Sequence, residues 1–169
     1  MKLKQTERLF LRELTVDDAA FILELLNQPS WLRFIGDRGV HSLEDAVRYI
    51  QNGPVASYQR FGFGLYLVLG REDGLPMGLC GLLKRDIFED VDIGFAFMPQ
   101  FWHQGFAHEA ASAVLALAQA EFSLPCLVAV ANPDNFSSIN LLGRLGFQYE
   151  KMVRLVEDGP ELSFFRCRF

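Results

Sequence analysis

The chain has 169 residues, half of them hydrophobic, and this length and composition suit a single globular domain, residues 1–169, with a substantial core. The formal net charge of -5 argues against a nucleic-acid-binding protein, because such proteins need a basic surface. Glycine, proline or charge interrupts each apolar run before it reaches membrane-spanning length, and residues 1–8 lack the apolar core of a signal peptide.

The cysteines and histidines point to a reducing compartment and to no metal site. The three cysteines are far apart and contain no C-x-x-C pair, and the three histidines lack metal-ligand spacing. We therefore expect a cytoplasmic protein without a membrane, nucleic-acid or metal partner.

The first half of the chain has the pattern of a strand, two helices and a hairpin. Thr15 and Ser42 each precede acidic residues, as helix N-caps do, and Asp73-Gly74 between apolar runs is a turn signal. The patterning predicts a strand over 6–14, helices over 19–26 and 43–57 with a loop over 30–39 between them, and strands over 61–69 and 77–84.

The second half centres on an apolar strand that leads through a short aromatic loop into a long, alanine-rich helix. Asn135 is a good N-cap, and Gly146 suits the end of the helix that follows it. The predicted elements are a strand ending at Pro99, a helix over 104–122, a strand over 126–131, a helix from Asn135, and strands over 147–156 and 161–169.

The junction between this strand and the long helix has the features of an anion-binding site. The first amides of a helix have no partner within it, and the helix dipole adds positive charge at the same end. Gly105 lets the backbone approach a phosphate closely, and Ala107 is small. No Gly-Lys-Ser/Thr and no complete G-x-G-x-x-G is present, so this is not the P-loop of a nucleotide hydrolase, and a simple turn is the alternative.

Three stretches resemble motifs of the GNAT N-acetyltransferases. Residues 101–110, F-W-H-Q-G-F-A-H-E-A, are similar to the pyrophosphate loop of that family, Q/R-x-x-G-x-G/A, with Trp102 in place of the usual Gln or Arg. Residues 135–147 are similar to its N-x-x-S/A-x-x-L-x-x-x-x-G-F signature. T-E-R-L-F-L-R at 6–12 is similar to the first strand of the Rim-type branch, which acetylates the N-termini of ribosomal proteins.

The resemblance implies an α+β fold of the GNAT type, and the predicted order of elements agrees with it. The implied sheet is central, mixed, mostly antiparallel and twisted, with about seven strands flanked by about four helices. It is splayed between the fourth and fifth strands, where the cofactor inserts.

The resemblance also implies transfer of an acetyl group from acetyl-CoA to a primary amine, by direct attack in a ternary complex. The acceptor amine is a protein N-terminus or a small molecule. A backbone N–H of Phe97 or Met98 would polarise the thioester carbonyl. The implied cofactor-binding residues are Phe97, Met98, His103, Gln104, Gly105, Phe106, Ala107, His108, Asn135 and Ser138.

An attacking amine must be neutral, so the reaction needs a base. Asp92 shares a strand face with small residues and matches the acidic position before I/V-G-Y/F in the family, so it is the first candidate, with Glu89 second. The alternative is that both are solvated charges. Leu142 stands where many family members carry a tyrosine as general acid, which makes Ser138 the candidate acid, unless the thiolate leaves without one.

The segment between the first two helices commonly lines the acceptor side of the cleft in the family. Trp31, Arg33 and Phe34 are therefore the candidate substrate-binding residues, the alternative being that the two aromatic side chains only fill the core.

Two other functions stay open: a non-catalytic acyl-CoA-binding or sensing domain, and transfer of another acyl group, set by the pocket near Ala96 and Leu142. Both a monomer and a homodimer are compatible with the sequence.

Overall fold

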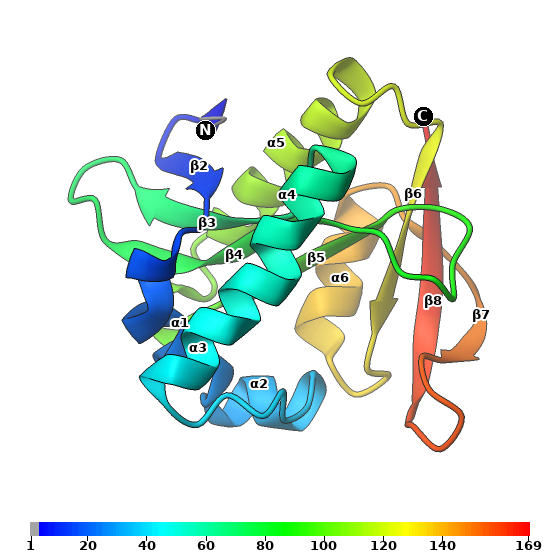
Figure 1. The fold of residues 1–169 in the computed structure, drawn as a ribbon. Coiled ribbons are helices and arrows are strands. Elements are labelled where there is room, and N and C mark those ends of the chain that lie inside the picture. The colour runs from blue at the N-terminus through cyan, green and yellow to red at the C-terminus, as the bar shows by residue number, and fades with distance from the viewer. Residues whose placement is uncertain (1–3) are drawn as a thin grey trace.

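A computed structural model describes residues 4–169, which form an α+β fold around one eight-stranded sheet (Figure 1). The strand order is β1-β2-β3-β4-β5-β6-β8-β7, and among the strands of residues 4–169 only the β5–β6 pair is parallel. The strands are β1 (Lys4–Gln5), β2 (Leu9–Glu13), β3 (Leu65–Gly70), β4 (Pro76–Leu83), β5 (Asp92–Phe97), β6 (Cys126–Ala131), β7 (Gln148–Arg154) and β8 (Glu161–Arg168). The expectation that no signal peptide is present concerned residues 1–8, and residues 1–3 of these lie outside the described residues.

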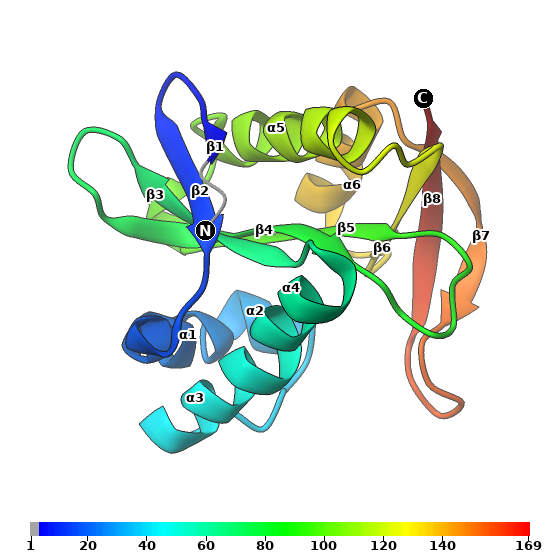
Figure 2. The same cartoon turned by 45° about the horizontal axis from the view of Figure 1, so that its top comes forward.

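Helices cover both faces of the sheet. They are α1 (Ala19–Leu26), α2 (Pro29–Phe34), α3 (Leu43–Ile50), α4 (Ala56–Phe61), α5 (Phe106–Ala120) and α6 (Phe136–Arg144), with the short turns η1 (Val16–Asp18), η2 (Gln51–Val55) and η3 (Pro99–Phe101). Figure 2 shows α5 and α6 on one face and α1 to α4 on the other. Accordingly, one core cluster contains Val114 and Leu117 of α5, and a second contains Ile22 of α1 and Ile50 of α3.

The sheet opens between β5 and β6. β4 and β5 pair at six positions, whereas β5 and β6 share one pair, Asp92 with Val128. The Val128 N–H donates to the Val91 carbonyl at 3.0 Å, next to this pair. After Asp92, the main-chain groups of β5 that face β6 are not paired with it. This opening between the two strands is the predicted splay.

Most of the elements predicted from the sequence are confirmed. β6 has the predicted bounds, and Asn135 caps α6 by accepting the Ser138 N–H. The sheet has one strand more than expected, because β1 pairs with β2 as a short edge strand. The loop predicted over 30–39 is wrong in its first half, because Pro29, whose fixed φ suits the start of a helix, begins α2.

The helix predicted over 43–57 continues to Phe61 but is not regular throughout. Pro54 lies within it and has no N–H, so the α-helical hydrogen bonding is interrupted and the chain passes through the π-helical turn η2 before α4. Gly62, left-handed with a φ of 81°, ends it. Within residues 4–169 the structure contains no helix long and apolar enough to cross a membrane.

Candidate active site

The loop between β5 and α5 presents an uncapped helix N-terminus. Gly105 precedes α5 with a left-handed φ of 81°, and no side chain of the described residues caps the helix there. The helical hydrogen bonds begin with the Glu109 N–H, which donates to the Gly105 carbonyl at 3.0 Å. The N–H groups of Phe106, Ala107 and His108 therefore have no partner within the helix. Together with the helix dipole, they form a site for an anion.

A cavity of about 550 Å³ extends from this helix N-terminus along the end of β5. It is lined by residues of α1, of α2 and the residues beside it, of β5, the β5–α5 loop and α5, and of α6 with the two residues before it. Eight of the ten expected cofactor-binding residues line it: Phe97, His103, Gly105, Phe106, Ala107, His108, Asn135 and Ser138. The other two do not, because the Gln104 side chain is exposed and Met98 is buried in the core.

The register of β4 and β5 decides which main-chain N–H at the end of β5 is available. The Met98 N–H donates to the Met77 carbonyl at 2.9 Å, so the expectation that it serves a bound thioester is corrected. Because hydrogen-bonded pairs alternate in an antiparallel ladder, the N–H and carbonyl of Phe97 point away from β4. That carbonyl accepts the indole N–H of Trp102 at 2.9 Å, which fastens the loop to the strand. Of the two expected donors, Phe97 is the one that faces the gap.

The α6 wall carries polar side chains. Asn135 Oδ1 accepts the Ser138 N–H at 3.3 Å, so Asn135 caps the helix and also lines the cavity. Ser138 is half-buried and lines the cavity beside it. Leu142, at the position of the tyrosine that the resemblance implies, is fully buried and outside the wall, so this position supplies no acid.

Aromatic side chains of α2 form another part of the wall. Trp31 is both a core residue, 7% exposed, and a lining residue. Its indole N–H donates to the Gly36 carbonyl at 3.1 Å, which fixes the ring. Phe34 also lines the cavity. Arg33 is exposed and does not; its guanidinium lies 4.6 Å from the centroid of the Phe34 ring.

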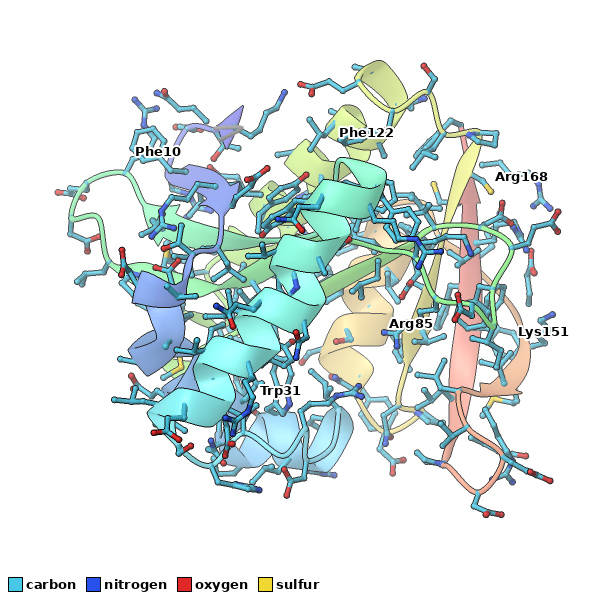
Figure 3. All side chains as sticks on the ribbon, viewed as in Figure 1. Phe10, Trp31, Arg85, Phe122, Lys151 and Arg168 are labelled. Atoms are coloured by element: carbon cyan, nitrogen blue, oxygen red, sulfur yellow. The ribbon has the colours of Figure 1, made fainter. Side chains whose placement is uncertain are left out.

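The two candidate bases lie outside the cavity wall. Asp92 is 1% exposed, and its Oδ2 accepts the Nε–H of Arg85, from the segment between β4 and β5 (Figure 3), at 3.2 Å. Its Oδ1 has no hydrogen-bond partner among the described residues. Burial raises the pKa of Asp92 to about 6 and outweighs the nearby Arg85 charge. Glu89 is exposed in the same segment.

Several lining residues were not expected from the sequence. They are Leu25, Gln28, Ser30, Ile35, Phe95, Phe101, Asp134, Phe136, Ser137, Asn140, Leu141 and Arg144. Helical periodicity could have found part of this set, because Ser137, Asn140, Leu141 and Arg144 have the i, i+3, i+4, i+7 spacing of one helix face. Asp134 is the one carboxylate among the lining residues of the described chain.

The fold and the loop together define a class of enzyme. The family model of the acetyltransferase (GNAT) domain matches residues 8–148. The chain therefore belongs to the GNAT family of N-acetyltransferases, as its three motifs predicted.

Relatives of known sequence and structure agree with this class. YoaA of Bacillus subtilis (strain 168), named an uncharacterized N-acetyltransferase, is 29% identical over 152 residues, which cover 89% of this chain and 85% of YoaA. An acetyltransferase structure from Agrobacterium tumefaciens has a TM-score of 0.84 and 24% identity, covering 100% of this chain and 95% of that one. RimL, an alpha-N-acetyltransferase of a ribosomal protein solved in complex with coenzyme A, has a TM-score of 0.85 and 18% identity, covering 99% and 98%. At such identities the solved structures establish the fold.

Proposed function

We propose that this protein transfers an acetyl group from acetyl-CoA to a primary amine while both are bound in a ternary complex. The observation that carries the proposal is the uncapped N-terminus of α5, which opens into the cavity at the end of β5. Free main-chain amides at a helix N-terminus suit the diphosphate of coenzyme A. The coenzyme A bound to RimL, which has the same fold, supports this choice of donor.

The residues present fit coenzyme A. The N–H groups of Phe106, Ala107 and His108 would hold the diphosphate, and Asn135 and Ser138 would contact the arm that carries the sulfur. Bound acetyl-CoA would supply an acetyl thioester, which is already activated toward an amine. Side-chain identity matters little for main-chain donors, so Trp102 in place of Gln or Arg leaves the site intact.

The Phe97 N–H is the proposed donor to the thioester carbonyl. It faces the gap, and the β4–β5 ladder holds it in place before any ligand arrives, as electrostatic catalysis requires. The Ser138 hydroxyl is the proposed donor to the departing sulfur. Because a thiolate is a good leaving group, we expect Ser138 to contribute less than Phe97.

Asp92 is the proposed base, with Glu89 second. The support is chemical: a pKa of about 6 lies near the working pH of a general base, and Oδ1 is free of partners in the described chain. Asp92 precedes Ala96 by four residues on one face of β5, and Ala96 lines the cavity. Asp92 itself lies outside the wall, so it would act through water.

The wall favours an acceptor with one amine beside an apolar group. Trp31 and Phe34 supply aromatic surface, and Asp134 is the one lining carboxylate in the described chain. A polyamine or an aminoglycoside would need several carboxylates to replace its hydration. A peptide N-terminus or a small monoamine is therefore the proposed acceptor, in a cytoplasmic protein that is a monomer or a homodimer.

The test is thiol release from acetyl-CoA by the purified protein, with N-terminal peptides, monoamines, polyamines and aminoglycosides as acceptors. We expect release that depends on a peptide or monoamine. Binding of acetyl-CoA without release against any acceptor would favour the alternative, a non-catalytic acyl-CoA sensor. Failure to bind acetyl-CoA would overturn both functions.

A further inference from the structure

Arg8, which precedes β2, reaches across to the helix end that forms the anion site. Its Nη1–H donates to the carbonyl of Gln104 in the β5–α5 loop at 2.9 Å, and its guanidinium carbon lies 4.2 Å from the centroid of the Phe106 ring. A Cβ built at Gly105 would lie 3.2 Å from Arg8 Nη2. The glycine therefore allows both the left-handed turn and the close approach of Arg8.

Glu109 is the second partner of Arg8 and lies in the first turn of α5. Its carboxylate accepts the Arg8 Nε–H at 2.7 Å, the Arg8 main-chain N–H at 2.8 Å and the Thr6 hydroxyl at 2.6 Å. Burial raises the pKa of Glu109, but these hydrogen bonds outweigh it and leave the pKa lowered, so the group is ionised at neutral pH. The end of the helix that should receive an anion thus carries a full negative charge.

The negative charge of Glu109 opposes the binding of an anion at this helix end, and Arg8 neutralises that charge. A carboxylate in the first turn stabilises a helix, but it repels an anionic ligand bound at the same end. The planar fork of arginine can neutralise Glu109 through Nε and hold the Gln104 carbonyl through Nη1 at the same time. A single ammonium group has no such fixed geometry.

We propose that Arg8 is a positioning residue of the donor site, which fixes the loop at Gln104 and cancels the charge of Glu109 so that the first amides of α5 can bind a diphosphate. This inference rests on the proposed function, in which that diphosphate belongs to coenzyme A. Arg8 acts through the loop and through Glu109, not by contact with the ligand.

The experiment compares three ligands by calorimetric titration. Coenzyme A carries the diphosphate and a 3′-phosphate, dephospho-coenzyme A keeps only the diphosphate, and pantetheine lacks both. In the Arg8→Gln variant we expect the Kd of coenzyme A and of dephospho-coenzyme A to rise by the same factor, about tenfold, because charge-assisted contacts are lost. The Kd of pantetheine should stay unchanged. Arg8→Lys, which keeps the charge but not the fork, should lose part of the affinity.

The matched control is Arg12→Gln, because Arg12 on β2 also pairs with a carboxylate, that of Asp18, through two hydrogen bonds of 2.8 and 2.9 Å away from the loop. It should lower the melting temperature without changing the Kd of coenzyme A. Adding Glu109→Gln to Arg8→Gln should recover part of the lost affinity, leaving the Kd within about threefold of the wild type, because the repelling charge is gone.

Each contrary result has a distinct meaning. If the wild type does not bind coenzyme A, the proposed function fails and this inference fails with it. If the wild type binds and Arg8→Gln binds equally well, only the inference is overturned. A loss confined to coenzyme A would make Arg8 a direct 3′-phosphate contact, and a loss shared by pantetheine or by Arg12→Gln would make it a general structural residue; both overturn the positioning role.

Discussion

The two halves of the cavity differ in the groups that form them, main chain in one and side chains in the other. The half that we propose for the acetyl donor consists of main-chain groups: the first amides of α5, the left-handed Gly105 and the outer edge of Phe97. The half that we propose for the acceptor consists of side chains: Trp31 and Phe34 on α2 and, behind the wall, the covered carboxylate of Asp92. A main-chain site tolerates sequence change as long as its backbone angles persist, whereas a side-chain site changes with each substitution. A constant donor can therefore be combined with a variable acceptor on one fold.

The largest expected effect is a loss of turnover, without a loss of coenzyme A binding, when Asp92 is replaced. Asp92→Asn should lower kcat by about 10²–10⁴-fold, because a general base contributes that much. The Kd of coenzyme A should stay unchanged, since Asp92 does not line the cavity. The control is Asp90→Asn, at a neighbouring carboxylate that pairs with Arg166 at 2.5 Å. Steady-state kinetics measures kcat, and calorimetry measures the Kd of coenzyme A. If Asp92→Asn and Asp90→Asn have the same kcat, Asp92 is not the base.

The same carboxylate should make stability depend on pH. Burial raises the pKa of Asp92 from 3.8 to about 6, so the folded protein holds this proton more tightly than the unfolded chain. Its ionisation therefore costs stability as pH rises from about 4 to about 6, by about 3 kcal/mol in total. Urea unfolding of the wild type and Asp92→Asn should show the variant gaining in relative stability over this interval. A difference that is constant with pH would contradict the raised pKa.

A smaller effect should appear in the donor half when Gly105 becomes alanine. The left-handed conformation costs a residue with a Cβ roughly 1–2 kcal/mol, so the affinity for coenzyme A should fall by about tenfold. Gly143→Ala is the control, because that glycine lies in α6 without a left-handed φ, and a Cβ there meets no atom within 4 Å. It should preserve binding and slightly raise the melting temperature. Equal affinity in Gly105→Ala and the wild type would refute the requirement for glycine.

The smallest expected effect concerns the two indole hydrogen bonds, one in each half. Trp102→Phe removes the donor to the Phe97 carbonyl, and Trp31→Phe removes the donor to the Gly36 carbonyl. Each should lower the free energy of unfolding by about 1 kcal/mol in urea titrations. Trp102→Phe alone should also weaken coenzyme A binding, because the loop is then fastened less firmly. A larger loss of donor affinity in Trp31→Phe would contradict the division into halves.

The two halves also differ in how far the sequence predicts them. Gly105 and Asn135 follow from local signals, a glycine before a helix and an N-cap, whereas the splay was implied by the resemblance to the GNAT family. Asp92 was predicted as a cleft residue because alternation gives the face of a strand, but alternation does not say what covers that face. The availability of the Met98 N–H depended on the β4–β5 register, which no motif specifies.

Long-range contacts were the least predictable part of the site. Arg8 and Glu109 each lie in a recognised motif, yet their 101-residue separation gives no sign that they pair. α2 was missed for a different reason, since its aromatic and basic composition resembled that of a loop. Tertiary packing decides the Arg8–Glu109 pair, and a single sequence carries little information about it, whereas α2 had a local signal in Pro29 at its first position.

The positions of the tryptophans give the molecule a built-in optical reporter. The chain has two, and each stands in one half of the cavity, Trp31 buried at 7% exposure and Trp102 exposed at 42%. Indole emission depends on the polarity and on the quenching groups around the ring, so each single-tryptophan variant should report on one half alone. If the proposed halves are right, we expect emission from Trp102 to follow arrival of the donor and emission from Trp31 to follow arrival of the acceptor. Stopped-flow mixing can thus establish the order in which the two substrates bind, without a label on either.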